Sequence, residues 1–176
     1  MWHTKNIVIY QGIAKITDFG HSKSIHTIMK LHNDLFGNIR FVAPEVLRAS
    51  KTKQDPHTKS SDIYSLGVLL WEISSGKPPF EDFNDYTIVA NILLEHREER
   101  IPDTPSEYYK LYSECWNNEP KKRHTIEYIY KVLEKLLDEN ELEKEGKINY
   151  IILDLFYILV NNLFFSNINL NFRNFE

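Results

Sequence analysis

The sequence has a single cysteine, Cys115, among its 176 residues. An internal disulfide is therefore excluded, and so little cysteine suits a reducing compartment such as the cytoplasm. A basic excess is also lacking, because 21 Lys and Arg residues against 25 Asp and Glu residues give a net charge of -4 at pH 7. The basic run Lys121–His124 is too short for a nucleic-acid footprint, so we expect no nucleic-acid partner.

Long hydrophobic runs are scarce as well. The first apolar run, Ile7–Tyr10, is much shorter than a signal-peptide core and has no basic leader. The stretch 148–165 approaches the length of a membrane span, but polar residues such as Asn149, Asp154 and Asn161 interrupt it. We therefore expect a cytoplasmic chain that does not enter a membrane.

What is present is the composition of a globular domain. Hydrophobic residues make up 42% of the chain and charged residues 26%, which is enough to build one buried core at this length. Two short β-type segments, Ile7–Ile9 and Ala14–Ile16, flank a link that contains Gly12 and predict a small hairpin. Residues 20–42 are polar and aperiodic, so we expect a long loop there.

The stretch Asp62–Ser75 is apolar on nearly every side, which predicts a helix buried among other helices. Ser60 and Ser61 are its expected N-caps, and Gly76 is its expected stop. Three amphipathic helices are expected to follow, two of them capped by Ser106 and by Thr125. Their apolar faces are, in chain order, Ile88 and Ile92 with Val89 and Leu93 beside them; Tyr108, Leu111, Tyr112 and Cys115; and Ile126, Ile129, Tyr130, Leu133 and Leu137. The predicted fold class is therefore mainly α, with one small hairpin at its N-terminal edge.

Four motifs resemble the C-terminal lobe of a eukaryotic protein kinase. Asp18-Phe19-Gly20 resembles the family's DFG triplet, and Ala43-Pro44-Glu45 resembles the APE triplet that ends the activation segment. The stretch 62–80 resembles the buried central helix, and 115–126, which contains Arg123, is similar to the pattern CW-x-x-[DE]-P-x-x-R-P-[ST]. The four occur in family order and spacing, and their style is closest to the tyrosine-kinase-like branch.

The resemblance implies a kinase-like helical lobe over residues 1–137, with an activation segment at 18–45 and the N-lobe absent. Residues 138–176 are expected to form a low-complexity tail without a predictable fold, because Asn, Ile, Leu and Phe dominate its last part without capping or turn signals.

The resemblance also implies ATP and magnesium as cofactors. Asp18 would hold magnesium on the phosphates, and Asn6, twelve positions earlier, would hold a second metal. Without the other motifs, Asp18 reads as a turn residue at a strand end and Asn6 as an ordinary polar residue.

Five positions before Asn6, where the family has its catalytic Asp, the chain has Met1. A thioether cannot accept the proton of a substrate hydroxyl. The sequence also lacks a glycine-rich G-x-G-x-x-G run, so we expect poor ATP binding and no phosphate transfer by this polypeptide.

Two functional interpretations therefore stay open. One is a fragment of a protein kinase domain, with protein substrates phosphorylated on Ser, Thr or Tyr. The other is a non-catalytic interaction module that binds partner proteins. A lobe face normally covered by the N-lobe would be apolar, so self-association is a further expectation.

The remaining motif residues are interpreted as architecture. Glu45 and Arg123 resemble a buried ion pair that ties the activation segment to the late helices, with a weak surface pair as the alternative. Asp62 caps the catalytic loop in the family and suits a helix N-terminus by its charge.

The expected activation segment has hydroxyls but no tyrosine. Ser22, Ser24 and Thr27 are candidate phosphosites, with solvated loop hydroxyls as the alternative. Two positions depart from the family: His21 follows the DFG triplet in place of an apolar residue, and Asn38 stands where Thr often follows the glycine.

Overall fold

The computed structural model describes residues 7–10, 13–16, 39–49 and 58–138. Its elements are β1 (Ile7–Tyr10), β2 (Ile13–Ile16), η3 (Ile39–Phe41), α1 (Pro44–Ala49), α2 (Lys59–Ser75), α3 (Asp85–Leu93), α4 (Ser106–Cys115), η4 (Pro120–Lys122) and α5 (Ile126–Asp138). The mainly α class and the N-terminal hairpin are thus confirmed. The predicted loop is interrupted by η3 at its end, while the rest of that loop and the predicted tail beyond residue 138 lie outside the described residues.

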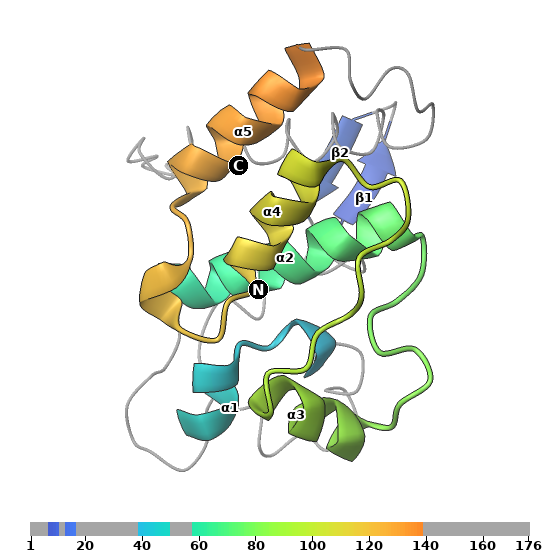
Figure 1. The fold of residues 1–176 in the computed structure, drawn as a ribbon, viewed down its shortest axis with the longest axis vertical. Coiled ribbons are helices and arrows are strands. Elements are labelled where there is room, and N and C mark those ends of the chain that lie inside the picture. The colour runs from blue at the N-terminus through green and yellow to red at the C-terminus, as the bar shows by residue number, and fades with distance from the viewer. Residues whose placement is uncertain (1–6, 11–12, 17–38, 50–57, 139–176) are drawn as a thin grey trace, which may run out of the picture.

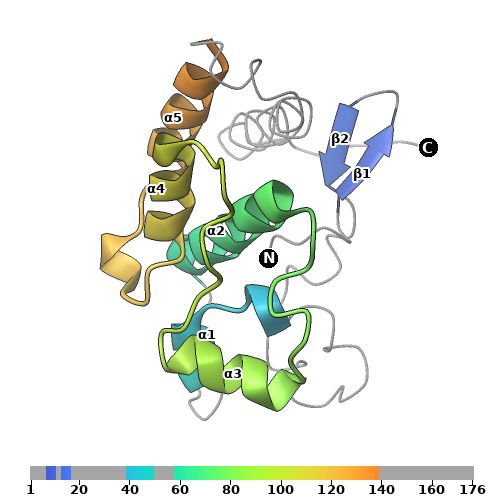
Figure 2. The same ribbon diagram turned by 45° about the vertical axis from the view of Figure 1, so that its right-hand side comes forward.

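The hairpin is antiparallel, and its register pairs Ile7 with Ile16 and Tyr10 with Ile13. Its β-branched residues favour the extended conformation. In Figure 2 the two strands lie to one side of the helices.

Helix α2 is the centre of the molecule, as its all-round apolar sequence predicted. Figure 1 shows α4 and α5 on one side of α2 and α1 and α3 on the other, and the most extensive contacts of α2 are with α4, followed by η3 and η4. Every residue from Ile63 to Trp71 is buried. A helix buried all round needs partners on both sides, and the two layers supply them.

The predicted N-caps of α2 are wrong, whereas its predicted stop is confirmed. The N-cap is Thr58, whose side chain accepts a hydrogen bond from the Ser61 N–H at 3.3 Å, while the Ser61 hydroxyl accepts from the Thr58 N–H at 3.0 Å. This reciprocal capping box starts the helix earlier than the first apolar residue suggests. Gly76 ends it with φ 67°, a left-handed conformation that glycine adopts without strain.

The amphipathic helices bury most of the predicted faces. On α4 all four predicted residues are buried: Tyr108, Leu111, Tyr112 and Cys115. On α3, Ile88 and Ile92 are fully buried. On α5 the buried residues are Ile129, Leu133 and Leu136, so the inward face is turned toward Leu136, and Tyr130 is only half-buried. The side chain of Leu137 lies outside the described part.

The two remaining cap predictions have opposite outcomes. Thr125 caps α5, because its side chain accepts the Tyr128 N–H at 3.4 Å. Ser106 does not cap α4, since it is the first helical residue and Pro105 precedes it without a side-chain cap. The Ser106 hydroxyl instead accepts a hydrogen bond from Arg100 Nη2 at 3.4 Å.

No helix within the described ranges is long and apolar enough to cross a bilayer.

Candidate functional site

The expected site is only partly within the described residues. Outside them lie the candidate metal ligands Asn6 and Asp18, the rest of the DFG triplet (Phe19 and Gly20), and Met1 at the position of the catalytic base. The candidate phosphosites Ser22, Ser24 and Thr27 and the two departures from the family, His21 and Asn38, lie outside them as well. Inside them lie Ala43, Pro44, Glu45, Asp62 and Arg123. The described part of the site is therefore the Ala43-Pro44-Glu45 triplet and its attachment to the helices.

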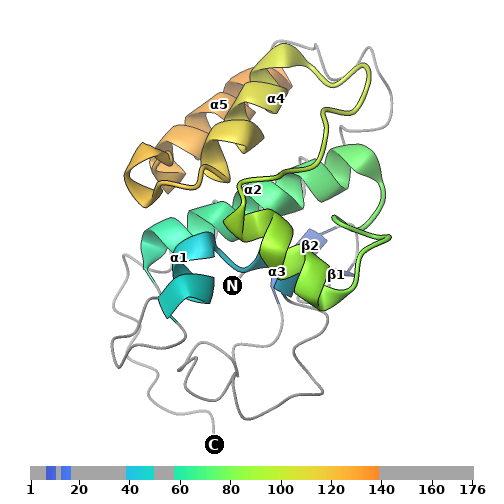
Figure 3. The same cartoon turned by 60° about the horizontal axis from the view of Figure 1, so that its bottom comes forward.

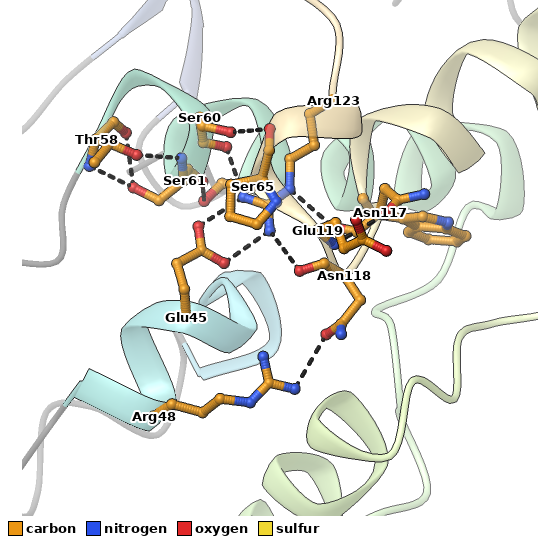
Figure 4. Close-up of polar contacts among 12 residues, drawn as sticks. Glu45, Arg48, Thr58, Ser60, Ser61, Ser65, Asn117, Asn118, Glu119 and Arg123 are labelled. Carbon is orange, nitrogen blue, oxygen red and sulfur yellow. Dashed lines mark hydrogen bonds and ion pairs between the residues drawn. The ribbon is translucent and has the colours of Figure 1, made fainter.

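The attachment is an ion pair between Glu45 on α1 and Arg123 directly after η4 (Figure 4). Arg123 Nη1 donates to Glu45 Oε1 and Nη2 donates to Oε2, both at 2.7 Å. The side chain of Arg123 is fully buried and that of Glu45 is 23% exposed. The planar guanidinium thus meets the carboxylate with two parallel hydrogen bonds, the strongest geometry for such a pair.

Backbone carbonyls satisfy the rest of the guanidinium. Arg123 Nη1 also donates to the Ser60 carbonyl at 2.9 Å, and Nε donates to the Asn117 carbonyl at 2.8 Å. A longer contact of 3.5 Å joins Nη2 to the Asn118 carbonyl. A buried charge is tolerated only when it is paired and its other donors are satisfied, and both conditions hold here. One side chain therefore connects α1, the start of α2 and the turn after α4.

The ring of Tyr64 on α2 lies beneath two guanidinium groups. Arg123 Cζ is 5.2 Å and Arg97 Cζ is 5.3 Å from the ring centroid, within the range of a cation–π interaction. Burial raises the pKa of Tyr64 to about 12, against the lowering effect of the two arginine charges. The tyrosine is therefore a neutral ring that packs under the ion pair.

The Ala43-Pro44-Glu45 triplet lies where the chain enters α1. Pro44 is the first residue of that helix, a position where proline costs no hydrogen bond because the missing N–H has no intrahelical partner. Ala43 and Pro44 are buried, and the Ser65 hydroxyl of α2 donates to the Phe41 carbonyl of η3 at 2.8 Å. The stretch that leads into the triplet is thus hydrogen-bonded to the central helix.

Asp62 lies in the first turn of α2 and is half-buried, which fits the predicted role of a negative charge at a helix N-terminus. In the described part of the chain no three His, Cys, Asp or Glu residues gather in a way that could hold a metal ion. The described residues thus hold the Ala43-Pro44-Glu45 triplet against the helices.

Two polar connections near the ion pair were missed by the sequence analysis. Arg48 Nη2 donates to Asn118 Oδ1 at 3.3 Å (Figure 4). Asn118 Nδ2 in turn donates to Glu95 Oε1 at 2.8 Å, which links α1 to the end of α3. His124, in place of the proline in the family pattern, contacts the Glu114 carboxylate, and its ring stacks on Tyr128 at 4.1 Å between centroids. The departure at residue 124 from the motif was the one signal available.

Comparison with known proteins agrees with the motifs. A family model described as protein tyrosine and serine/threonine kinase matches residues 3–133. A probable LIM domain-containing serine/threonine-protein kinase of Dictyostelium discoideum is 31% identical over 143 residues, which cover 81% of this chain and 21% of that protein. Mouse mitogen-activated protein kinase kinase kinase 10 is 34% identical over 123 residues, which cover 69% of this chain and 12% of that protein.

The chain thus spans about a fifth or less of the length of these two relatives. The family match itself extends over most of the chain, from before β1 into α5. On that match, the chain belongs to the protein tyrosine and serine/threonine kinase family.

Proposed function

We propose that residues 1–137 are the C-lobe of a protein kinase domain, whose reaction transfers the γ-phosphate of ATP to a hydroxyl of a protein substrate. The bidentate Glu45–Arg123 pair carries the proposal, because it joins two of the recognised motifs that are 78 residues apart. The names of the relatives, serine/threonine-protein kinase among them, favour Ser and Thr as acceptors. Residues 138–176 are proposed to be a tail outside this domain, and a chain with one cysteine suits a cytoplasmic location.

Asn6 and Asp18 are the residues that would hold magnesium. The register that pairs Ile7 with Ile16 brings together the two strand ends that adjoin these residues in the sequence. Amide and carboxylate oxygens are the ligands that a hard cation such as magnesium prefers, so the residue types fit. When bound, the metal would neutralise charge on the ATP phosphates.

This polypeptide has no suitable base at the position that accepts the substrate proton in the family. Met1 stands at that position, and its thioether has no basic oxygen for the hydroxyl proton. We therefore propose that the 176 residues alone do not transfer phosphate.

The test is an assay of the purified chain with radiolabelled ATP, magnesium and myelin basic protein as a generic acceptor. We expect the chain and its Asp18→Ala variant to give the same background incorporation. Magnesium-dependent incorporation that Asp18→Ala abolishes would overturn the inactive assignment while supporting Asp18 as a metal ligand.

A non-catalytic interaction module is the second candidate function. His21 and Asn38, at positions where the family uses an apolar residue and often a Thr, favour it because they alter the segment that positions peptide substrates.

Phosphorylation of Ser22, Ser24 or Thr27 would be relevant to both candidate functions. Mass spectrometry of the chain isolated from cells would detect modification at these hydroxyls, and their absence from the phosphopeptides would remove this proposed regulation.

A further inference from the structure

Helix α3 is apolar on two opposite faces. Its inward face consists of Ile88 and Ile92, which are fully buried where α3 packs against η3 and α1. Its outward face, at a spacing of four residues, consists of Tyr86, Ala90 and the C-cap residue Leu94, all of them exposed, and the exposed Phe83 lies in the turn before the helix. The exposed fractions are 47% for Phe83, 88% for Tyr86 and 66% for Leu94. Figure 3 brings this helix to the front of the molecule, on the side of α2 away from α4 and α5.

An outward apolar face is unusual for a helix at the surface of a monomer. Such helices normally carry polar residues on the side away from the core. A single exposed hydrophobic residue needs no explanation, but Tyr86 and Leu94, the two most exposed of the five large exposed hydrophobics in the described part of the chain, lie on this one face. The other three have aromatic or cation–π partners: Phe83 packs against Phe80 at 6.5 Å between ring centroids, Tyr109 lies under the Arg100 guanidinium at 5.0 Å, and Tyr128 stacks on His124.

The charged residues at the N-terminal end of this face in the sequence are acidic. Glu81, Asp82 and Asp85 adjoin Phe83 and Tyr86, and no Lys or Arg occurs between residues 78 and 96. Glu81 and Asp82 are exposed. The Asn84 side chain accepts the Thr87 N–H at 3.0 Å, which fixes how this acidic loop enters α3.

Two guanidinium groups at the other end of α3 bind backbone carbonyls and an amide oxygen. Arg97 Nη1 donates to the carbonyls of Ile92 and His96, at 3.2 and 2.8 Å. Arg48 donates to the Leu93 carbonyl and to Asn118. The face therefore combines an apolar stripe with an acidic end.

We propose that the outward face of α3 docks a basic, amphipathic segment of a partner protein. Apolar side chains of the segment would lie on Tyr86, Ala90 and Leu94, which have the spacing that helix recognition uses. Its Lys or Arg residues would lie over the acidic loop, where they meet the carboxylates and the exposed faces of Phe83 and Tyr86. This docking requires no phosphate transfer, so it stands apart from the proposed function.

A second copy of the chain is a poorer occupant on grounds of charge. A symmetric contact through this face would place the carboxylates of Glu81 and Asp82 against the same acidic region of the other copy. Like charges brought together across an interface disfavour association. The acidic end of the face is therefore complementary to a basic partner and not to a second copy of the chain.

The test uses the full chain and a fluorescein-labelled amphipathic peptide of leucine and lysine, with binding followed by fluorescence anisotropy. We expect Tyr86→Ala and the double variant Glu81→Lys/Asp82→Lys each to weaken binding about tenfold. Both changes are at exposed positions, and circular dichroism would show that the fold is kept.

Matched controls come from the other side of the molecule. Tyr128→Ala removes an aromatic of similar exposure to Phe83, and Glu107→Lys reverses an exposed carboxylate on α4. We expect neither to change binding by more than about twofold. Equal weakening by the controls, or none by the α3 variants, would overturn the proposal. So would sedimentation showing a dimer that Tyr86→Ala dissociates while peptide binding is unchanged.

Discussion

The guanidinium of Arg123 binds three segments of the chain: α1, the start of α2 and the turn after α4. Replacement by methionine keeps an apolar stem but leaves the Glu45 carboxylate and the Ser60 carbonyl without their donor. We expect Arg123→Met to lower the free energy of unfolding by about 3 to 5 kcal/mol, because the partner charge remains partly buried. Urea denaturation followed by circular dichroism measures the loss.

Lys122 is the matched control for that change. It forms an ion pair with Glu119 in which the side chains are 60% and 62% exposed, so Lys122→Met should cost less than about 1 kcal/mol. The double variant Arg123→Met/Glu45→Leu should recover part of the loss, since no charge is then stranded. Equal losses for Arg123→Met and Lys122→Met would contradict the assignment of a buried pair.

Two neighbouring tyrosines on α4 offer a second comparison at the residue scale. The Tyr108 hydroxyl donates to the Leu70 carbonyl at 2.8 Å, whereas the buried Tyr112 hydroxyl has no hydrogen-bond partner in the described structure. Tyr108→Phe should destabilise the chain by about 1 kcal/mol, while Tyr112→Phe should be neutral or slightly stabilising. Thermal unfolding of the two variants checks the order, and a larger cost for Tyr112→Phe would show that its hydroxyl is bonded in solution.

These residue-scale contacts differ in how far the sequence could predict them. Glu45 and Arg123 could be paired because each belongs to a recognisable motif, although 78 residues separate them. Arg48 and Asn118 belong to no such pattern, and their contact depends on how α1 meets the turn after α4. Contacts of that kind follow from tertiary packing, which local sequence does not encode.

At the scale of elements, the contact between α2 and α4 depends on Gly67. A Cβ at this position would lie 2.8 Å from Cys115 Cβ and 2.8 Å from the Trp116 backbone nitrogen. Gly67→Ala should therefore force the two helices apart and cost about 1 to 3 kcal/mol, despite the better helix propensity of alanine. Chemical denaturation measures the change.

Gly76 is the control at the end of the same helix. A Cβ there would contact nothing within 4 Å, but its φ of +67° is unfavourable for alanine. Gly76→Ala should cost only about 1 kcal/mol, from backbone strain rather than from packing. If Gly67→Ala cost less than Gly76→Ala, the close approach of α2 and α4 would be contradicted.

The hydrophobic pattern of the sequence predicted which segments are helices. It did not predict where each helix begins or which of its faces is buried. The run from Ile63 to Trp71 could only be a buried element, and it is. Its start was missed because Thr58 and Ser61 form a capping box ahead of the apolar residues. The same periodicity did not decide which side of α5 faces α4, because Tyr130 and Leu136 both fit a helical repeat.

At the scale of the whole molecule, α2 separates two layers with different tasks. The layer with η3, α1 and α3 holds the Ala43-Pro44-Glu45 triplet and the proposed docking face, whereas α4 and α5 complete the core on the other side (Figures 1 and 2). The ion pair of Arg123 crosses between these layers at one end of α2. The motifs predicted this lobe as a family resemblance, while the outward apolar face of α3 became evident only from the observed exposures.

The buried tyrosines predict how the molecule responds to alkaline pH. Burial raises the pKa of Tyr64 and of Tyr112 to about 12 from the model-peptide value of 10.0, and it raises the pKa of Tyr108 as well. Below pH 10 these groups are neutral in both states, so their contribution to stability is complete. Between pH 10 and 12 the unfolded chain releases their protons and the folded chain does not, so stability falls as pH rises.

For Tyr64 alone, the shift corresponds to a loss of about 3 kcal/mol across that window. The Tyr64→Phe variant cannot ionise at this position, so its free energy of unfolding should fall less steeply between about pH 10 and 12. Tyr86→Phe is the control, because it removes a tyrosine hydroxyl from a side chain that is 88% exposed. Urea titrations at a series of pH values measure the slopes, and equal slopes for Tyr64→Phe and the unmodified chain would mean that Tyr64 ionises in the folded state.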